Sequence, residues 1–147
     1  MKLKVPYGGY LHGIKMFSPL QQAGETKVCG PAYTVQMVDA SNTAAPKTDK
    51  HFADGIEKDS VVFISQPKGM YSACWGGLMS TRAKYLGAQG VVIDGNFRDI
   101  NEHRGMAFPV STTRTSVRSQ PADSILPSCS RNRHLRLART HSQGQPL

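Results

Sequence analysis

The chain has 147 residues and a formal net charge of +8, with 39% hydrophobic and 19% charged residues. This length suits one domain, and the composition is too apolar for a chain that is disordered throughout. No apolar run approaches the roughly 20 residues of a bilayer crossing, and residues 1–9 lack the unbroken apolar stretch of a secretory signal. We therefore expect one cytoplasmic globular domain without a membrane span.

The predicted elements follow from the spacing of apolar residues. Alternating apolar residues predict a strand, continuous β-branched runs predict buried strands, and apolar residues three or four apart predict helices. The expected strands are 32–38, 60–65, 91–93 and an edge strand at 107–110, and the expected helices are 49–57, 78–86 and 98–104. A turn is expected at Asp94-Gly95. Together these elements predict an α/β fold.

Residues 113–147 differ in composition from the residues before them. They are rich in Ser, Arg, Thr, Gln and Pro, contain no lysine, glutamate or aromatic residue, and carry most of the net charge. A basic tail can bind phosphate or a membrane surface. Because no aromatic residues interleave with its arginines, as stacking on nucleic acid needs, an unstructured end without a selected role is the favoured interpretation, and nucleic acid is not expected as a partner. We interpret residues 1–112 as an α/β domain and residues 113–147 as a basic, disordered tail.

Residues 60–94 have the order strand, loop, helix, strand. This order is a βαβ unit, in which the two strands are parallel and the crossover is right-handed. Ligands of such sheets bind at the carboxyl ends of the strands. These ends are the segments 65–77 and 94–99, so we expect both segments to line one crevice.

Gly76 and Gly77 stand directly before the predicted helix 78–86. The unpaired backbone amides at a helix start bind anions, so the amides of Gly77, Leu78 and Met79 are a candidate site for a carboxylate or phosphate. The alternative interpretation is structural, because two glycines also let a loop approach a sheet closely.

The densest polar cluster contains Arg98, Asp99, Glu102 and His103. On a helix, Asp99 and Glu102 share a face, and one or two carboxylates with several waters are sufficient to hold Mg²⁺. The Arg98 guanidinium can form paired hydrogen bonds to a substrate carboxylate or carbonyl. An ordinary solvated helix start remains the alternative, because acidic residues are common there.

The three cysteines, Cys29, Cys74 and Cys129, are too widely spaced for a zinc clip and odd in number. We expect free thiols, with Cys74 packed as a small apolar residue.

Two motifs at a fixed separation resemble a known family. The first is the run Gly-Gly-Leu-Met-Ser-Thr-Arg-Ala from Gly76 to Ala83, and the second is the segment from Gly90 to Arg104, which contains Arg98-Asp99. The chain resembles the RraA-like family, which contains class II 4-hydroxy-4-methyl-2-oxoglutarate (HMG) aldolases, oxaloacetate decarboxylases and the regulator of ribonuclease E activity. The resemblance covers about residues 5–109 and is strongest to fungal-type members.

The resemblance implies a swivelling β/β/α domain that assembles as a homotrimer or hexamer, with the pocket near a subunit boundary. It implies that Arg98 binds the pyruvyl group and is the catalytic residue. It also implies that Asp99 holds a water-coordinated Mg²⁺ or Mn²⁺ with support from Glu102. By the same resemblance, the substrate carboxylate lies at the amides that follow Gly77.

The chain departs from the family pattern at one site position and at both ends. Counting 21 positions back from Arg98, the aldolase motif has an aspartate, and this sequence has Gly77. The resemblance further implies a fold that is incomplete relative to the family. The family's N-terminal helix and its elements after Pro109, with an acidic residue that completes the neighbouring subunit's pocket, are expected to be missing.

These features predict a divalent-metal-dependent carbon–carbon lyase that acts on pyruvyl-type 2-oxo acids. Aldol cleavage of HMG needs a base, whereas decarboxylation of oxaloacetate needs only an electron sink. We therefore expect oxaloacetate decarboxylation first and HMG cleavage second, with His103 a candidate for the missing base. The alternative is a non-catalytic protein of the ribonuclease-regulator type, or an inactive truncated relative.

Overall fold

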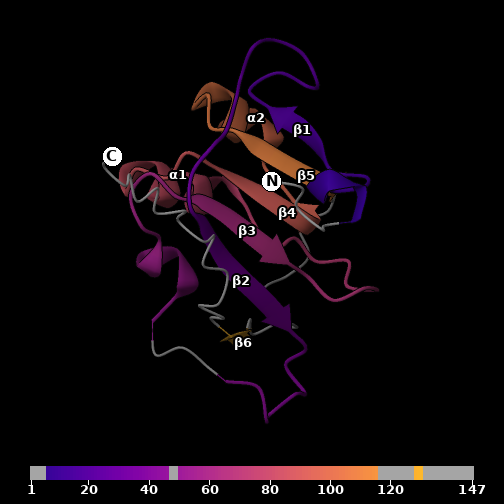
Figure 1. Cartoon of the computed structure of the whole chain (residues 1–147). Helices are drawn as coiled ribbons and strands as arrows, with labels where there is room; N and C mark the ends of the chain where they lie inside the picture. The colour runs from indigo at the N-terminus through magenta and orange to yellow at the C-terminus, as the bar shows by residue number, and fades with distance from the viewer. Residues whose placement is uncertain (1–5, 47–49, 116–127, 131–147) are drawn as a thin grey trace, which may run out of the picture.

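A computed structural model describes residues 6–46, 50–115 and 128–130 of the chain. In these residues, six strands form one mixed sheet in the order β1-β5-β4-β3-β2-β6 (Figure 1). The strands are β1 (Lys15–Ser18), β2 (Ala32–Val38), β3 (Val61–Ser65), β4 (Gly90–Phe97), β5 (Val110–Thr115) and β6 (Ser128–Ser130). The helical elements are α1 (Gly77–Tyr85), α2 (Ile100–Gly105) and the 3₁₀ turns η1 (Pro6–Gly9) and η2 (Phe52–Gly55).

The centre of the sheet is parallel, as the βαβ pattern predicted. Strands β2, β3, β4 and β5 are parallel to one another, whereas the edge strands β1 and β6 pair antiparallel with β5 and β2. Val62 and Ile64 of β3 and Val91 and Ile93 of β4 are almost completely buried. Burial of such side chains is the main source of stability in a sheet of this kind.

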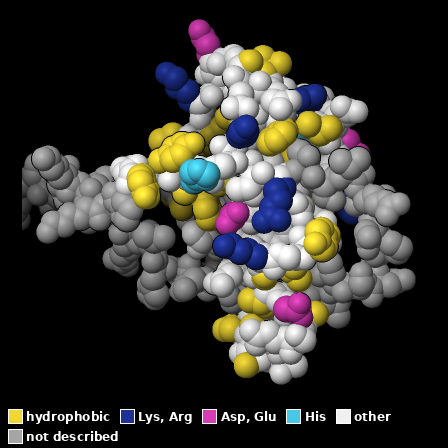
Figure 2. All heavy atoms as spheres, turned by 90° about the vertical axis from the view of Figure 1, so that its right-hand side faces the viewer, with side chains coloured by type: hydrophobic (Ala, Val, Ile, Leu, Met, Phe, Trp, Pro, Cys, Tyr) yellow, Lys and Arg dark blue, Asp and Glu magenta, His cyan; other side chains and the backbone are white. Residues whose placement is uncertain are grey.

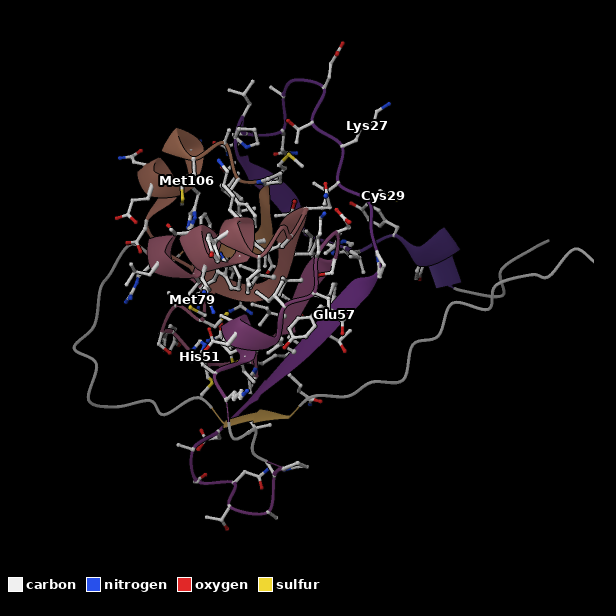
Figure 3. The ribbon with its side chains drawn as sticks, turned by 90° about the vertical axis from the view of Figure 1, so that its left-hand side faces the viewer. Lys27, Cys29, His51, Glu57, Met79 and Met106 are labelled. Atoms are coloured by element: carbon white, nitrogen blue, oxygen red, sulfur yellow. The ribbon has the colours of Figure 1, made fainter. Side chains whose placement is uncertain are left out.

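Helices α1 and α2 and the turn η2 lie on the same face of the sheet (Figure 3). Helix α1 packs through small residues, since Ser80 and Ala83 are buried while Leu78 and Tyr85 are more than four-fifths exposed. On the face drawn in Figure 2, basic side chains stand among acidic and apolar ones. Within the described residues, we find no helix with the length and hydropathy of a membrane span.

Two predicted elements differ from the structure. The predicted helix 49–57 is a single 3₁₀ turn, η2, which His51 caps and which ends where Ile56 is extended. The Tyr33 hydroxyl donates to the Phe52 carbonyl at 2.8 Å, so this carbonyl has a partner outside the helix. The predicted edge strand 107–110 is wrong, because β5 begins at Val110 and lies between β1 and β4.

The turn predicted at Asp94-Gly95 is also wrong, because β4 continues to Phe97. Its register against β5 shifts between Ile93 and Asn96, which marks a bulge. Two side chains of the neighbouring strand β5 bond the bulged backbone: Thr113 Oγ1 accepts from the Gly95 amide at 3.1 Å, and Thr112 Oγ1 donates to the Gly95 carbonyl at 2.8 Å. These hydrogen bonds let the strand extend past two turn-forming residues.

Strand β5 extends to Thr115, past the boundary expected at residue 112. Strand β6 also lies within the segment expected to be a tail and pairs with β2. The rest of the expected tail, 116–127 and 131–147, lies outside the described residues.

Candidate active site

The end of β4 lies against the loop that precedes α1. Trp75 and Phe97 form an isolated parallel bridge, and the Arg98 amide donates to the Trp75 carbonyl at 3.0 Å. The segments 65–77 and 94–99 therefore meet at one edge of the sheet, as the βαβ pattern predicted. Arg98 and Asp99 follow this bridge directly and are consequently placed beside Gly76 and Gly77.

Asp99 links the two helices. Its backbone is left-handed, with φ of 65°, and its side chain does not cap its own helix α2. Instead, Asp99 Oδ2 accepts a hydrogen bond from the Gly77 amide at 2.9 Å and lies 3.4 Å from Arg98 Nε. A carboxylate at the start of α1 is favoured by the unpaired amides and by the helix dipole. The anion site predicted at Gly76-Gly77 thus holds the chain's own Asp99.

The three amides predicted to bind an anion have different partners. The Gly77 amide donates to Asp99, and the Met79 amide donates to the Gly76 carbonyl at 3.0 Å. The Leu78 amide has no hydrogen-bond partner within the described part of the chain. Of the three amides, the Leu78 amide is therefore the one left open to an external anion.

Two carboxylates converge on the adjacent glycines. A Cβ built on Gly76 would lie 2.7 Å from Asp99 Oδ2, and a Cβ built on Gly77 would overlap the carboxylate of Glu102. Both glycines are buried, and their lack of a side chain is what leaves room for Asp99 and Glu102. The close-approach interpretation of Gly76-Gly77 therefore holds together with the anion interpretation.

The donor set suits a hard divalent cation. The Asp99 carboxylate lies beside Gly76, and the Glu102 carboxylate lies beside the adjacent Gly77. Mg²⁺ in proteins commonly has one or two carboxylate ligands and keeps several waters. No group of three or more His, Cys, Asp or Glu side chains is gathered for a metal in the described ranges. The residues present therefore fit a water-rich magnesium or manganese site and not a closed cage.

His103 is not accessible to a substrate, contrary to its candidate role as a base. Its side chain is fully buried, and its Nε2 lies 2.6 Å from the Arg98 carbonyl. Its ring packs against Phe97, with centroids 5.5 Å apart. His103 is therefore a support beneath Arg98, and the interpretation as a base is wrong.

Cys74 is an inert thiol, as predicted. Burial raises its pKa to about 12, and its Sγ lies 3.4 Å from the Asn96 carbonyl. A thiol with so high a pKa is not a nucleophile near neutral pH.

The sequence reasoning missed the part played by Trp75. This single tryptophan is 1% exposed, and its Nε1 donates to Ser80 Oγ at 2.7 Å. It thereby fixes the start of α1 while its backbone holds Arg98. An isolated large aromatic residue directly before a Gly-Gly pair was the available signal.

Comparison with known proteins identifies the family. The model of the RraA-like family, described as aldolase/RraA, matches residues 6–135. The chain belongs to the RraA-like family.

Two curated relatives match shorter parts of this RraA-like chain. A Halalkalibacterium halodurans protein, provisionally named as a 4-hydroxy-4-methyl-2-oxoglutarate aldolase, is 32% identical over 91 residues, which is 62% of this chain and 41% of that protein. An uncharacterized Methanocaldococcus jannaschii protein is 50% identical over 44 residues, which is 29% of this chain and 21% of that protein. The chain thus spans less than half of either relative.

Solved structures confirm the RraA-like fold. An uncharacterized Pseudomonas syringae protein has a TM-score of 0.54 at 30% identity, over 71% of this chain and 44% of that one. A Streptomyces coelicolor member of the RNase ES inhibitor RraA family has a TM-score of 0.52 at 24% identity, over 68% of this chain and 50% of that one. A Thermus RNA-processing inhibitor RraA has a TM-score of 0.53 at 17% identity, over 80% of this chain and 65% of that one.

His103 gives this RraA-like chain a pH-dependent stability. Burial lowers its pKa from the ordinary 6.5, against the opposing effects of the Arg98 carbonyl and the charges of Asp99 and Glu102. The unfolded chain therefore binds a proton at a higher pH than the folded chain, and stability is lost as the pH falls below about 6.5. Urea unfolding at about pH 7.5 and about pH 5.5 measures this loss. A His103→Gln variant whose pH dependence matched that of the original chain would contradict the assignment.

Proposed function

We propose that the chain is a divalent-metal-dependent carbon–carbon lyase that forms pyruvate from pyruvyl-type 2-oxo acids, with oxaloacetate as the principal substrate. The observation that carries this proposal is the placement of Arg98 and Asp99 against the first amides of α1. The Arg98 guanidinium, the Asp99 carboxylate and the unpaired Leu78 amide then lie close to the start of α1. The name of the Halalkalibacterium relative supports the same class of reaction.

Each group has a task in the decarboxylation. The Leu78 amide binds the C1 carboxylate of the substrate, and the half-exposed Arg98 guanidinium donates to the 2-oxo oxygen. The C3–C4 bond then breaks, C4 leaves as CO₂, and the electron pair forms the enolate of pyruvate. Arg98 stabilises the negative charge that develops on the enolate oxygen, and C3 takes a proton from water.

Asp99 and Glu102 would hold the cation of this site, Mg²⁺ or Mn²⁺. When bound, the cation supplies a Lewis acid that draws electrons from the 2-oxo group. The Gly77 amide fixes one oxygen of Asp99, which leaves its second oxygen for other partners. The first amide of α1 therefore fixes the orientation of the Asp99 carboxylate.

Decarboxylation is favoured over aldol cleavage because no base is needed. Position 77, where the aldolase motif has an aspartate, is a glycine, and His103 is buried under Arg98. We expect HMG cleavage to be the weaker activity of the chain. This preference is checked by comparing kcat/KM for the two substrates.

We propose assembly into homotrimers or pairs of trimers in the cytoplasm. Leu78 is 84% exposed and Tyr85 is 81% exposed on α1, and these side chains offer apolar surface to another subunit. Size-exclusion chromatography with light scattering measures the assembly. A monomer at all concentrations would contradict it.

The activity is tested by pyruvate release from oxaloacetate with Mg²⁺ or Mn²⁺. We expect turnover above a control that contains the same metal without protein, and its loss when EDTA removes the metal. The metal-only control is essential, because the free ion also promotes this reaction.

The alternative function makes the opposite prediction. A non-catalytic protein of the ribonuclease-regulator type, or an inactive relative, would release no pyruvate above the control. It would also gain no thermal stability from Mg²⁺ with oxalate, which mimics the enolate. Absence of both effects would remove the lyase proposal.

A further inference from the structure

His103 forms a hydrogen bond whose direction is fixed by chemistry. A carbonyl oxygen can only accept, so the 2.6 Å contact between Nε2 and the Arg98 oxygen requires the proton on Nε2. His103 Nδ1 is buried and has no hydrogen-bond partner in the part of the chain that the structure describes. The buried ring is therefore neutral, with Nε2 protonated.

With this hydrogen bond, both backbone polar groups of Arg98 have partners. The Arg98 amide donates to the Trp75 carbonyl at 3.0 Å, and the Arg98 carbonyl accepts from His103. The next carbonyl, that of Asp99, accepts from the amides of Glu102 and His103 at 3.0 and 3.2 Å. Arg98 is thus bonded at both its amide and its carbonyl, and the Asp99 carbonyl closes the first turn of α2.

The restraint matters because the turn has an unfavourable backbone. Asp99 has φ of 65° and ψ of 41°, a left-handed conformation that few non-glycine residues adopt. Arg98 and Asp99 join the end of β4 to α2, so a small rotation of the backbone there would shift both side chains. The buried donor of His103 opposes that rotation.

We infer that His103 is the positioning residue for Arg98, acting through the Arg98 carbonyl and not through the substrate. This inference rests on the proposed lyase activity. His103 packs against Phe97 on one side and bonds Arg98 on the other, so it couples the rigid strand β4 to the catalytic turn. Without the His103 hydrogen bond, the Arg98 guanidinium is still present, but its orientation is no longer fixed.

The test separates the donor from the volume of the side chain. His103→Phe keeps a ring against Phe97 but has no donor. His103→Leu removes both the ring and the donor and keeps an apolar side chain. His103→Gln keeps an amide donor at a similar reach. We expect kcat/KM for oxaloacetate decarboxylation to fall about tenfold or more in the Phe and Leu variants and to recover largely in the Gln variant.

Two further measurements separate positioning from general destabilisation. Rates are compared at equal folded fraction, with Phe108→Leu as a matched core variant, since Phe108 is 2% exposed and follows α2. We expect Phe108→Leu to lower the melting temperature with no loss of kcat/KM per folded molecule. In ¹⁵N-histidine NMR spectra, His103 should show a proton on Nε2 and none on Nδ1.

Each outcome is decisive. Equal loss in the Phe, Leu and Gln variants, no loss in any of them, or a proton on Nδ1 would overturn the positioning role while leaving the lyase proposal intact. An inactive original chain, with no response to Mg²⁺ and oxalate, would overturn the lyase proposal and this inference with it. Recovery in the Gln variant alone, with the Nε2 proton present, supports the inference.

Discussion

Replacing Arg98 with alanine is expected to lower kcat/KM for oxaloacetate decarboxylation by about a hundredfold to a thousandfold, the usual effect of losing one donor to a developing oxyanion. The proposed donor, the Arg98 guanidinium, belongs to a half-exposed side chain, and its Nε lies 3.4 Å from Asp99 Oδ2. Its surface ion pair contributes little to stability, so the variant should fold normally. The measurement is pyruvate release at saturating Mg²⁺, with the melting temperature recorded in parallel.

The matched control is Arg82→Ala. Arg82 Nε lies 3.0 Å from Asp54 Oδ1, and both side chains are 46% exposed, so Arg82 is also a half-exposed arginine beside an acid. It lies on α1, however, and forms its ion pair with η2 and not with the candidate site. We expect unchanged activity and at most about 1 kcal/mol lower stability. Equal activity in the Arg98 and Arg82 variants would count against the catalytic role of Arg98.

The parallel centre of the fold was predictable because its signals are local. The β-branched runs of β3 and β4 fit strands buried in a parallel sheet, and the Gly76-Gly77 pair begins the connecting helix at the expected place. The order of strand, helix and strand then fixes the handedness of the crossover. The meeting of 65–77 with 94–99 follows from this topology alone.

The bulged end of β4 could not be predicted, because distant residues stabilise it. The Asp94-Gly95 pair has the local preference for a turn, yet Thr112 and Thr113 bond the Gly95 backbone. Gln66 adds a third contact, since its Oε1 accepts from the Asn96 amide at 2.9 Å. Hydrogen bonds from distant residues therefore outweigh the local preference of Asp94-Gly95 for a turn.

The site was only partly predictable for a similar reason. Helical spacing places Asp99 and Glu102 three positions apart, but it does not reveal that both carboxylates lie over α1. The same spacing leaves His103 within reach of Asp99, whereas the structure turns its ring under Arg98. Which side of α2 faces the sheet depends on Phe97 and the left-handed Asp99, and neither could be derived from the α2 sequence.

Replacing Gly77 with alanine is expected to weaken Mg²⁺ or Mn²⁺ binding and oxaloacetate turnover, each by about tenfold to a hundredfold. The new Cβ would overlap the Glu102 carboxylate, which must rotate away from position 77. The end of a glutamate side chain moves easily, so we expect an unfolding free energy only about 1 kcal/mol lower. Titration calorimetry with Mn²⁺ measures the binding, and urea unfolding measures the stability.

Gly105→Ala provides the control for this prediction within the same pair of helices. A Cβ on Gly105 meets no atom within 4 Å, and Gly105 is the last residue of α2. Alanine there should leave metal binding and turnover unchanged and raise stability by at most about 1 kcal/mol, because alanine favours the helix. If Gly77→Ala instead bound Mn²⁺ as tightly as Gly105→Ala, Glu102 would have no part in the metal site. The glycine would then serve only the close approach of α1 to α2, and Asp99 would remain the single carboxylate available to the cation.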